Sequence, residues 1–256
     1  MDQKTDTKVL QVEYNKIKLM VRKEELFLVY ATFVANEYHK LKIKPGDYVI
    51  DFGAGIGDFT VKASKLLRDK GEVFAVEPSR ENVKLLKANL ELNNVKNVKV
   101  FECAISDRDG FAYLNEAGSA GGYIMDSVTE NGERVKTCTI ETFLKDAGLV
   151  NKTGSVVKMD IEGAEIHVLK NIQFLRNVRE LAAELHGSDN VNTIPDFLRM
   201  HGFEVSTYRT ADAIKETVKS IIRNPPDFVK LEVLSDFTAL RGFLSALRSK
   251  NPIPSL

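Results

Sequence analysis

A short apolar run followed directly by alternating glycines is the feature that most limits how this 256-residue chain can fold. Residues 48–52 read YVIDF, and GAGIG follows at 53–57. A continuous apolar run of this length is typical of a strand buried on both faces of a parallel sheet. The glycines permit a tight turn into a helix and let a ligand approach the backbone. The pattern therefore predicts an α/β fold with a ligand-binding loop behind its first buried strand.

Predicted strands and helices alternate along the chain around this loop. Alternation at short spacing is typical of right-handed βαβ units and of a parallel sheet with helices on its faces. The apolar runs predict seven strands, at residues 48–52, 72–78, 97–105, 154–163, 178–187, 203–209 and 228–234. The amphipathic stretches predict helices at residues 58–69, 79–93, 139–147, 164–175, 190–201 and 211–223.

Further segments flank or interrupt this alternating core. We expect residues 1–44 to form an N-terminal appendage of two short strands and a helix at 23–41. The core domain is expected to span residues 45–234, with an inserted segment of short strands and loop at 106–138, where Asn-Gly and Asp-Gly turn signals occur. Residues 235–256 predict a C-terminal amphipathic helix and tail, whose apolar side offers a face for a homodimer.

Charge and composition argue against several classes of protein. Lys and Arg number 36, as do Asp and Glu, so the formal net charge is zero and a nucleic-acid coat is not expected. The sequence contains no run of ~18 apolar residues, so no membrane-spanning helix is expected. Residues 1–8 lack the apolar stretch of a signal peptide. The two cysteines, Cys103 and Cys138, lack metal or redox spacing and are expected as buried core thiols. These features predict a cytoplasmic protein.

The glycine loop distinguishes between two kinds of cofactor. The dinucleotide fingerprint G-x-G-x-x-G would require glycine at position 58, where Asp58 stands. A carboxylate just inside a helix N-terminus is a poor neighbour for a pyrophosphate. The pattern D-x-G-x-G-x-G, which begins at Asp51, instead resembles the first motif of class I S-adenosylmethionine (SAM) methyltransferases. The SAM ligand carries an ammonium and a sulfonium, so a nearby carboxylate is favourable.

Strand ends supply the other expected cofactor contacts. Glu77 ends the second predicted strand, where a carboxylate can accept hydrogen bonds from ribose hydroxyls. Ala104 and Ile105 end the third, at the place expected for an adenine ring. The predicted cofactor-binding residues are Asp51, Gly53, Ala54, Gly55, Gly57, Glu77, Pro78, Ala104, Ile105 and Asp160.

Acidic residues and a histidine end the fourth and fifth predicted strands. Ligands of open α/β sheets bind beyond the carboxyl ends of the strands, so these residues are expected at the mouth of the site. Strand alternation puts Glu184 and His186 on one face. His186 is the best candidate for a general base, because the ordinary pKa of histidine lies near neutrality, and Glu184 and Glu162 are expected beside it. Mg²⁺ or Mn²⁺ is a further possibility, held by Asp160, Glu184 and His186.

Beyond the glycine loop, the chain resembles the FkbM family of SAM-dependent methyltransferases. The resembling segments are VIDFGAGIGDFT (49–60), VFAVEPSRENVKLLKANLELNNVKNV (73–98), TCTIETFL (137–144), VVKMDIEGAEIHVLKN (156–171) and ELAAELHG (180–187). The resemblance implies a Rossmann-like sheet of seven strands, mostly parallel with the last antiparallel, and helices on both faces. It places Asp51, Gly53, Gly55, Glu77 and Asp160 on the cofactor side, and Glu162, Glu184 and His186 on the substrate side.

The resemblance implies methyl transfer from SAM, in many members to an oxygen of a secondary metabolite or sugar. We therefore expect direct displacement by a hydroxyl of a small molecule, with His186 taking the hydroxyl proton. Three alternatives remain open: an RNA or protein methyltransferase with the same core, a non-catalytic SAM-binding protein, and a NAD-dependent oxidoreductase, against which Asp58 argues.

Overall fold

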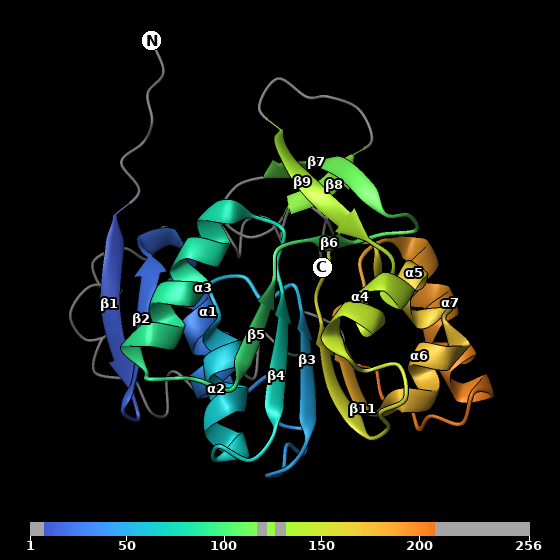
Figure 1. Cartoon of the computed structure of the whole chain (residues 1–256), viewed down its shortest axis with the longest axis horizontal. Coiled ribbons are helices and arrows are strands. Elements are labelled where there is room, and N and C mark those ends of the chain that lie inside the picture. Colours follow the sequence, from blue (N-terminus) through green and yellow to red (C-terminus); the bar gives the residue numbers. More distant parts are fainter. Residues whose placement is uncertain (1–7, 117–121, 126–131, 208–256) are drawn as a thin grey trace, which may run out of the picture.

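A parallel sheet of five strands forms the centre of the computed structural model, which describes residues 8–116, 122–125 and 132–207 (Figure 1). The strand order is β11-β10-β3-β4-β5, and every neighbouring pair is parallel. The strands are β3 (Tyr48–Phe52), β4 (Glu72–Val76), β5 (Val98–Phe101), β10 (Ser155–Met159) and β11 (Val178–Ala183). The predicted α/β class and parallel sheet are therefore confirmed.

The sheet differs from the prediction of seven strands, because five are found in the described part of the chain. Residues 203–207 form no strand, since no described strand pairs with them. The rest of the predicted sixth strand lies outside the described residues, as do the helix at 211–223, the seventh strand at 228–234 and the C-terminal helix proposed as a dimer face.

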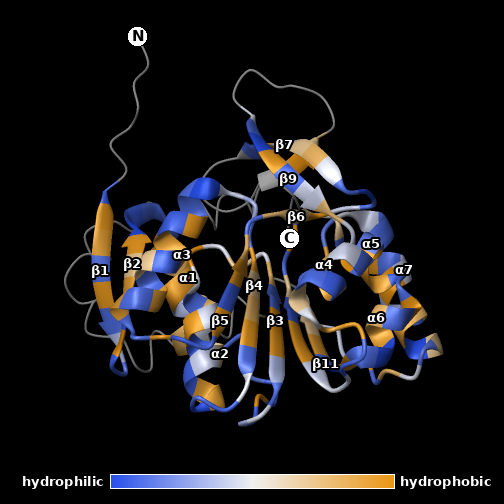
Figure 2. Ribbon diagram, in the orientation of Figure 1, coloured by the Kyte–Doolittle hydropathy of each residue, from blue (hydrophilic) through white to orange (hydrophobic). Residues whose placement is uncertain are grey.

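Alternate residues of the central strands face two separate apolar layers, as expected for a sheet covered on both sides. Val49, Val73 and Val156 pack against α2 (Asp58–Leu67), and α3 (Arg80–Leu92) lies beside α2 on this face. The neighbouring residues Ile50, Phe74 and Val157 face a larger cluster on the other side. That cluster is completed by α4 (Ile140–Ala147), α5 (Glu165–Leu169), α6 (Ile172–Asn177) and α7 (Ser188–Met200). Figure 2 shows these helices banded with hydrophobic and hydrophilic residues, as expected for one buried and one solvent side.

Asn89 of α3 and Asn93, which follows the last residue of α3, attach an N-terminal hairpin to the core. The hairpin consists of β1 (Val9–Tyr14) and β2 (Ile17–Arg22), which pair antiparallel. Asn89 is fully buried; it accepts from the Met20 N–H at 2.6 Å and donates to the Met20 carbonyl at 3.0 Å. Asn93 makes the same two kinds of bond with Lys18. The two amides therefore satisfy the backbone N–H and carbonyl groups of Lys18 and Met20, as a neighbouring strand would.

The helix predicted at 23–41 is broken into three short pieces. These are the 3₁₀ turn η1 (Lys23–Glu25), the single α-helical turn α1 (Leu26–Val29) and the π-helix η2 (Tyr30–Ala35). A π-helix is a rare, widened turn that often occurs at functional sites. Asn36 ends η2 in the left-handed conformation with φ 52°. No described helix is long and apolar enough to cross a membrane.

The segment predicted as an insertion contains most of a second, four-stranded sheet. Its order is β6-β9-β7-β8, formed by β6 (Ala104–Ile105), β7 (Gly110–Glu116), β8 (Gly122–Met125) and β9 (Glu133–Cys138). The predicted third strand, 97–105, is therefore too long, because the chain leaves the central sheet after Phe101 and β6 pairs with β9 instead. Figure 1 shows this second sheet above the central one, next to the end of β5.

Candidate functional site

The glycine loop lies where β3 ends, between its neighbours β4 and β10. The backbone N–H groups of Gly53 and Ala54 both donate to the Val76 carbonyl at 3.0 Å, which fixes the loop to the end of β4. A Cβ at position 53 would lie 1.7 Å from the Asp160 backbone oxygen, so only glycine fits there. Gly55 has φ +54° and would place a Cβ in open space. The loop is therefore held tightly on the side of β10 and is open at Gly55.

A buried ion pair lies beneath this loop and was missed by sequence reasoning about the site. Lys158 Nζ lies 3.3 Å from Asp51 Oδ1 and donates to the Gly53 carbonyl at 2.5 Å. Asp51 is fully buried and also accepts from Thr60 Oγ1 at 2.5 Å. Burial alone would lower the pKa of Lys158, but the charges of Asp51 and its acidic neighbours raise it above the ordinary value. The sequence feature that could have indicated this ion pair is a lysine inside the apolar run SVVKM.

Glu77 is buried at the end of β4 and faces the loop. Its carboxylate accepts from three N–H groups: the Gly55 backbone at 2.8 Å, the Ser79 backbone at 3.0 Å and the Asn82 side chain at 3.2 Å. Burial raises the pKa of Glu77, and these hydrogen bonds oppose the rise. A carboxylate offers about four acceptor positions, of which these bonds use three. Pro78, which follows, is half-buried.

Ala104 and Ile105 are buried in β6, so the residues predicted at the adenine end belong to the second sheet. The next residue, Ser106, lines a surface depression of about 300 Å³ with Thr139 and Ile166. The predicted cofactor-side residues therefore belong to two different sheets.

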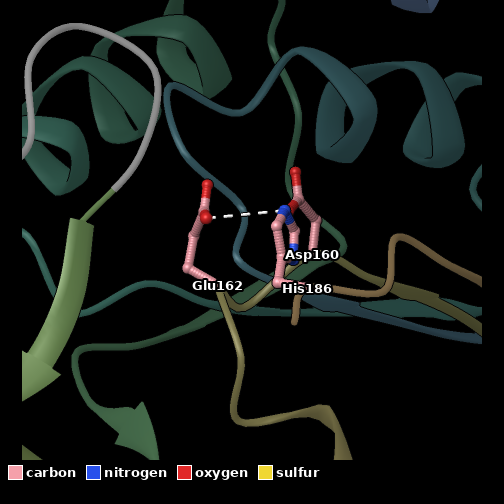
Figure 3. Close-up of side chains that lie close together, drawn as sticks. All are labelled: Asp160, Glu162 and His186. Carbon is pink, nitrogen blue, oxygen red and sulfur yellow. Dashed lines mark ion pairs between the residues drawn. The ribbon is translucent and has the colours of Figure 1, made fainter. Parts of the chain in front are cut away.

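Three predicted residues meet beyond the ends of β10 and β11, as Figure 3 shows. His186 Nε2 lies 3.4 Å from Glu162 Oε2 and 3.9 Å from Asp160 Oδ1. Asp160 Oδ1 is buried and has no hydrogen-bond partner among the described residues. Glu184 Oε1 also lies 3.9 Å from His186 Nε2. The structure thus brings together all four side chains that the sequence placed at the mouth.

The route by which Glu184 and His186 reach the site differs from the prediction. They were expected on one face of a strand that continued to residue 187, but β11 ends at Ala183. The Glu184 N–H still donates to the Met159 carbonyl at 2.9 Å, which keeps the chain beside β10 for one more residue. His186 therefore lies in the loop that leads into α7.

Glu165 is the functional candidate behind His186, and it was not among the predicted site residues. Its side chain is fully buried, and Oε1 lies 3.0 Å from His186 Nδ1. The Gly163 N–H donates to Oε1 at 3.0 Å, and Asn190 Nδ2 donates to Oε2 at 2.8 Å. These bonds hold the carboxylate in place, so it orients the imidazole with Nε2 toward the mouth. The sequence feature that could have indicated this role is the second glutamate of the segment DIEGAE.

The carboxylates around His186 change its acid–base behaviour. The hydrogen bond with Glu165 is the largest cause that raises the pKa of His186, to about 9, and Glu162, Asp160 and Glu184 add to the rise. Burial raises the pKa values of Glu162 and Glu184. Burial also acts to raise the pKa of Glu165, but the bond with His186 and its backbone bonds bring it below the ordinary value. His186 is therefore protonated at neutral pH in the free protein.

The same cluster has the composition of a divalent-cation site. The ligand atoms of Asp160, Glu162 and His186 all lie within 4.8 Å of one another. The predicted set contained Glu184 in place of Glu162. Carboxylate and imidazole ligands suit Mg²⁺, Mn²⁺ and related ions, and a buried carboxylate on the other nitrogen is the usual support of a metal-bound histidine.

The N-terminal segment reaches the same mouth. Thr32, in η2, donates to the buried carboxylate of Asp58, and the Tyr38 ring packs edge-on against Phe59 at 5.0 Å. Burial of the carboxyl group raises the pKa of Glu37 to about 7 and the charge of Asp58 adds to the rise, although the residue as a whole is exposed. The charges of Lys158 and Glu184 also act on Glu37. This short segment therefore adds an acidic group beside the residues contributed by β10 and β11.

Comparison with known proteins gives one family and several relatives. Residues 51–205 match the methyltransferase FkbM domain. The 31-O-demethyl-FK506 methyltransferase FkbM of Streptomyces tacrolimicus is 27% identical over 220 residues, which are 71% of this chain and 83% of that protein. A probable cobalt-precorrin-6B C(15)-methyltransferase (decarboxylating) of Saccharolobus solfataricus is 35% identical over 85 residues, 32% of this chain and 43% of that protein.

Among solved structures, a precorrin-6y C5,15-methyltransferase from Geobacter metallireducens is similar to this chain with a TM-score of 0.43 and 15% sequence identity. The match covers 77% of this chain and 79% of that one.

Proposed function

The chain belongs to the FkbM methyltransferase family, and on that premise we propose that it moves the methyl group of SAM to a hydroxyl oxygen of a small molecule. It is a SAM-dependent methyltransferase, so the family resemblance seen in the sequence is confirmed. The alternative of a NAD-dependent oxidoreductase is therefore rejected. A relative named for the methylation of 31-O-demethyl-FK506 supports an oxygen as the acceptor atom.

The residues around the glycine loop fit SAM. The open space at Gly55 lies beside the buried carboxylate of Glu77, which keeps about one free acceptor position. Asp160 adds a buried oxygen without a hydrogen-bond partner among the described residues. We propose that Glu77 holds the ribose, that the backbone of Gly53–Gly57 holds the methionine part, and that Ala104 and Ile105 border the adenine.

The pair formed by Glu165 and His186 is the observation that carries the proposed chemistry. SAM supplies a methyl group on a positively charged sulfur, which an oxygen nucleophile can attack. Glu165 fixes His186 through Nδ1, so Nε2 faces the mouth and can take the proton of the acceptor hydroxyl. Glu162 and Glu184 then lie beside the imidazolium and stabilise its charge. Such a base contributes about 10²–10⁴-fold to the rate.

The acid–base assignment has a clear test in the pH dependence of the reaction. Only neutral His186 can accept a proton, and its pKa in the free protein is about 9. The value of kcat/KM should therefore rise about tenfold per pH unit below pH ~9 and then level off. His186→Gln should lose this rise together with most of the rate. A flat profile between pH 7 and 9 would assign the base role to a carboxylate instead.

A bound divalent cation is the second way in which these residues could activate a hydroxyl. A cation held by Asp160, Glu162 and His186 would compete with the histidine proton and lower the pKa of a bound hydroxyl. Activity that survives exhaustive chelation would remove this route. Activity that is lost on chelation and restored by Mg²⁺ or Mn²⁺, but not in Glu162→Gln, would establish it.

Cofactor binding is the first measurement for the proposal. Calorimetric titration should show that SAM binds and that NAD does not. Glu77→Ala should weaken SAM binding, whereas Glu91→Ala, an exposed glutamate of α3, should leave it unchanged. Binding of NAD alone would contradict the cofactor assignment.

The acceptor is tested with methyl-labelled SAM and a panel of hydroxylated small molecules, with RNA and protein as competing acceptors. Label recovered as a methyl ether of a small molecule would support O-methylation. Label recovered only in RNA or protein would overturn the acceptor class while leaving the family assignment intact. We further propose that the N-terminal residues 8–41 and the inserted segment 106–138 select the acceptor, because η2 contacts Asp58 at the start of α2 and β9 contacts Arg80 at the start of α3 through Glu133.

A further inference from the structure

The two cysteines of the chain lie side by side, although 35 positions separate them in the sequence. Cys103 precedes β6 and Cys138 ends β9, and their sulfur atoms are 2.7 Å apart. The parallel pairing of β6 with β9 sets Ile105 opposite Cys138 and so holds the two thiols together. Both thiols are buried, as the sequence predicted, but their proximity was not visible in their spacing.

We propose that Cys103 and Cys138 form a reversible disulfide under mild oxidation. The full sequence holds no third cysteine, so neither thiol has another partner within the chain. A disulfide of ~2.05 Å requires the sulfur atoms to approach only slightly from their present separation. The bond would join the residue just before β6 to the end of β9, the last strand of the inserted segment.

The chemistry requires a small oxidant because both thiols are buried, and peroxide is suitable. Either sulfur can be the donor of the hydrogen bond between them, and with Cys138 as the donor the bond lowers the pKa of Cys103 and favours its thiolate. That thiolate attacks one peroxide oxygen and becomes a sulfenic acid, and the other oxygen leaves as water. The Cys138 sulfur then displaces a second water to form the S–S bond. Two thiols thus lose two electrons and two protons in total, and one peroxide becomes two waters.

A disulfide here would restrain the unfolded chain around the whole inserted segment. The closed loop contains β6, β7, β8 and β9. Because a cross-link reduces the freedom of the unfolded state, the oxidised protein should melt at a temperature ~5–15 °C higher than the reduced protein. Dithiothreitol should reverse the shift.

The test uses the full-length protein with dilute hydrogen peroxide, followed by unfolding and alkylation of free thiols. We expect the oxidised wild type to remain one chain by mass, to have lost two hydrogens and to take up no alkyl group. The reduced wild type should take up two. Proteolysis of the oxidised form should release one cross-linked peptide pair that contains Cys103 and Cys138.

Two variants separate this bond from other oxidation. Cys103→Ala/Cys138→Ala, treated in the same way, reports the oxygen gained by the five methionines. Cys138→Ser should show no peroxide-induced rise in melting temperature. Two alkylated thiols in the peroxide-treated wild type, a sulfinic acid at either position, or cross-linked dimers in place of the internal bond would each overturn the proposal. The wild-type thiol count decides the matter even if a variant fails to fold.

Discussion

The ammonium of Lys158 donates to the carbonyl oxygen of Gly53 at 2.5 Å and lies 3.3 Å from the carboxylate of Asp51. One buried side chain of β10 therefore supports both the end of β3 and the first glycine of the loop. The glycine loop has no protein neighbour around Gly55, where we propose that SAM binds. The charged side chain of Lys158 supports the loop from the opposite side.

Removal of this charge should weaken both the fold and the cofactor site. Lys158→Met leaves the Asp51 carboxylate buried without its cation, so the free energy of unfolding should fall by ~3–5 kcal/mol. Chemical denaturation measures the loss. Lys170→Met, which changes an exposed lysine, is the matched control and should stay within ~0.5 kcal/mol of the wild type. A loss below ~1 kcal/mol for Lys158→Met would show that Asp51 is supported by other groups.

Two glycine substitutions should distinguish the effect of close packing at Gly53 from the effect of blocked ligand space at Gly55. Gly53→Ala would place a methyl group 1.7 Å from a backbone oxygen of Asp160, so the protein should lose SAM binding and much of its stability. Gly55→Ala meets no protein atom and should cost only the ~1–2 kcal/mol of a left-handed backbone. It should still weaken SAM binding, because the methyl group enters the proposed ligand space. Calorimetry beside thermal unfolding distinguishes the two, and full SAM affinity in Gly55→Ala would place the ligand elsewhere.

Loss of the charge on Glu165 should change the acid–base behaviour of His186. The bond to Glu165 is the largest cause of the raised pKa of His186, so Glu165→Gln should lower that pKa toward the ordinary value of 6.5. An NMR titration of the imidazole measures this shift directly. The rate should fall by about 10²-fold or more, because the imidazole loses the partner that orients it and stabilises its charge. Glu91→Gln is the control for a glutamate that lies away from the site, and an unshifted histidine would contradict the Glu165 contact.

Stability should depend on the protonation of His186 in a defined pH range. The folded protein binds this proton more tightly than the unfolded chain, since the pKa is about 9 in the fold against 6.5 without it. The stabilisation is therefore complete below pH ~6.5 and is lost as the pH rises to about 9. Melting temperatures of the wild type and His186→Gln should converge over this range. Curves that stay parallel between pH 6 and 9.5 would contradict the raised pKa.

Most of the central sheet could be predicted from the sequence, because its signals are local. The run at 48–52 matches β3 residue for residue, and the predicted helix at 79–93 differs from α3 by one residue at each end. Ser79 caps α3 by accepting from the Asn82 N–H, as its residue type suggests. The strand at 97–105 was predicted too long because its apolar residues continue past Phe101, while the choice of partner strand is made by β9, far along the chain.

The mouth of the site was predicted in part for the same reason. Asp160, Glu162, Glu184 and His186 follow strand ends, so topology alone brings them together. Glu165 was left out of the predicted site and Lys158 was not considered, because their roles depend on contacts made after folding. Glu165 contacts the imidazole of His186, which comes from the segment after β11. Lys158 of β10 contacts the glycine loop, which follows β3. The contact between Cys103 and Cys138 likewise depends on the pairing of β6 with β9.

The π-helix η2 has a consequence for the coupling between two ligands. Its Thr32 donates to Asp58, and Lys62 bonds both the Thr32 carbonyl and Asn36 Oδ1. Asp58 and Lys62 belong to α2, the helix that the glycine loop begins. A ligand that stabilises the loop thus also stabilises η2, and thermodynamic reciprocity requires the reverse to the same degree. With the acceptor bound against η2 as proposed, cofactor and acceptor should therefore bind cooperatively, each raising the affinity of the protein for the other.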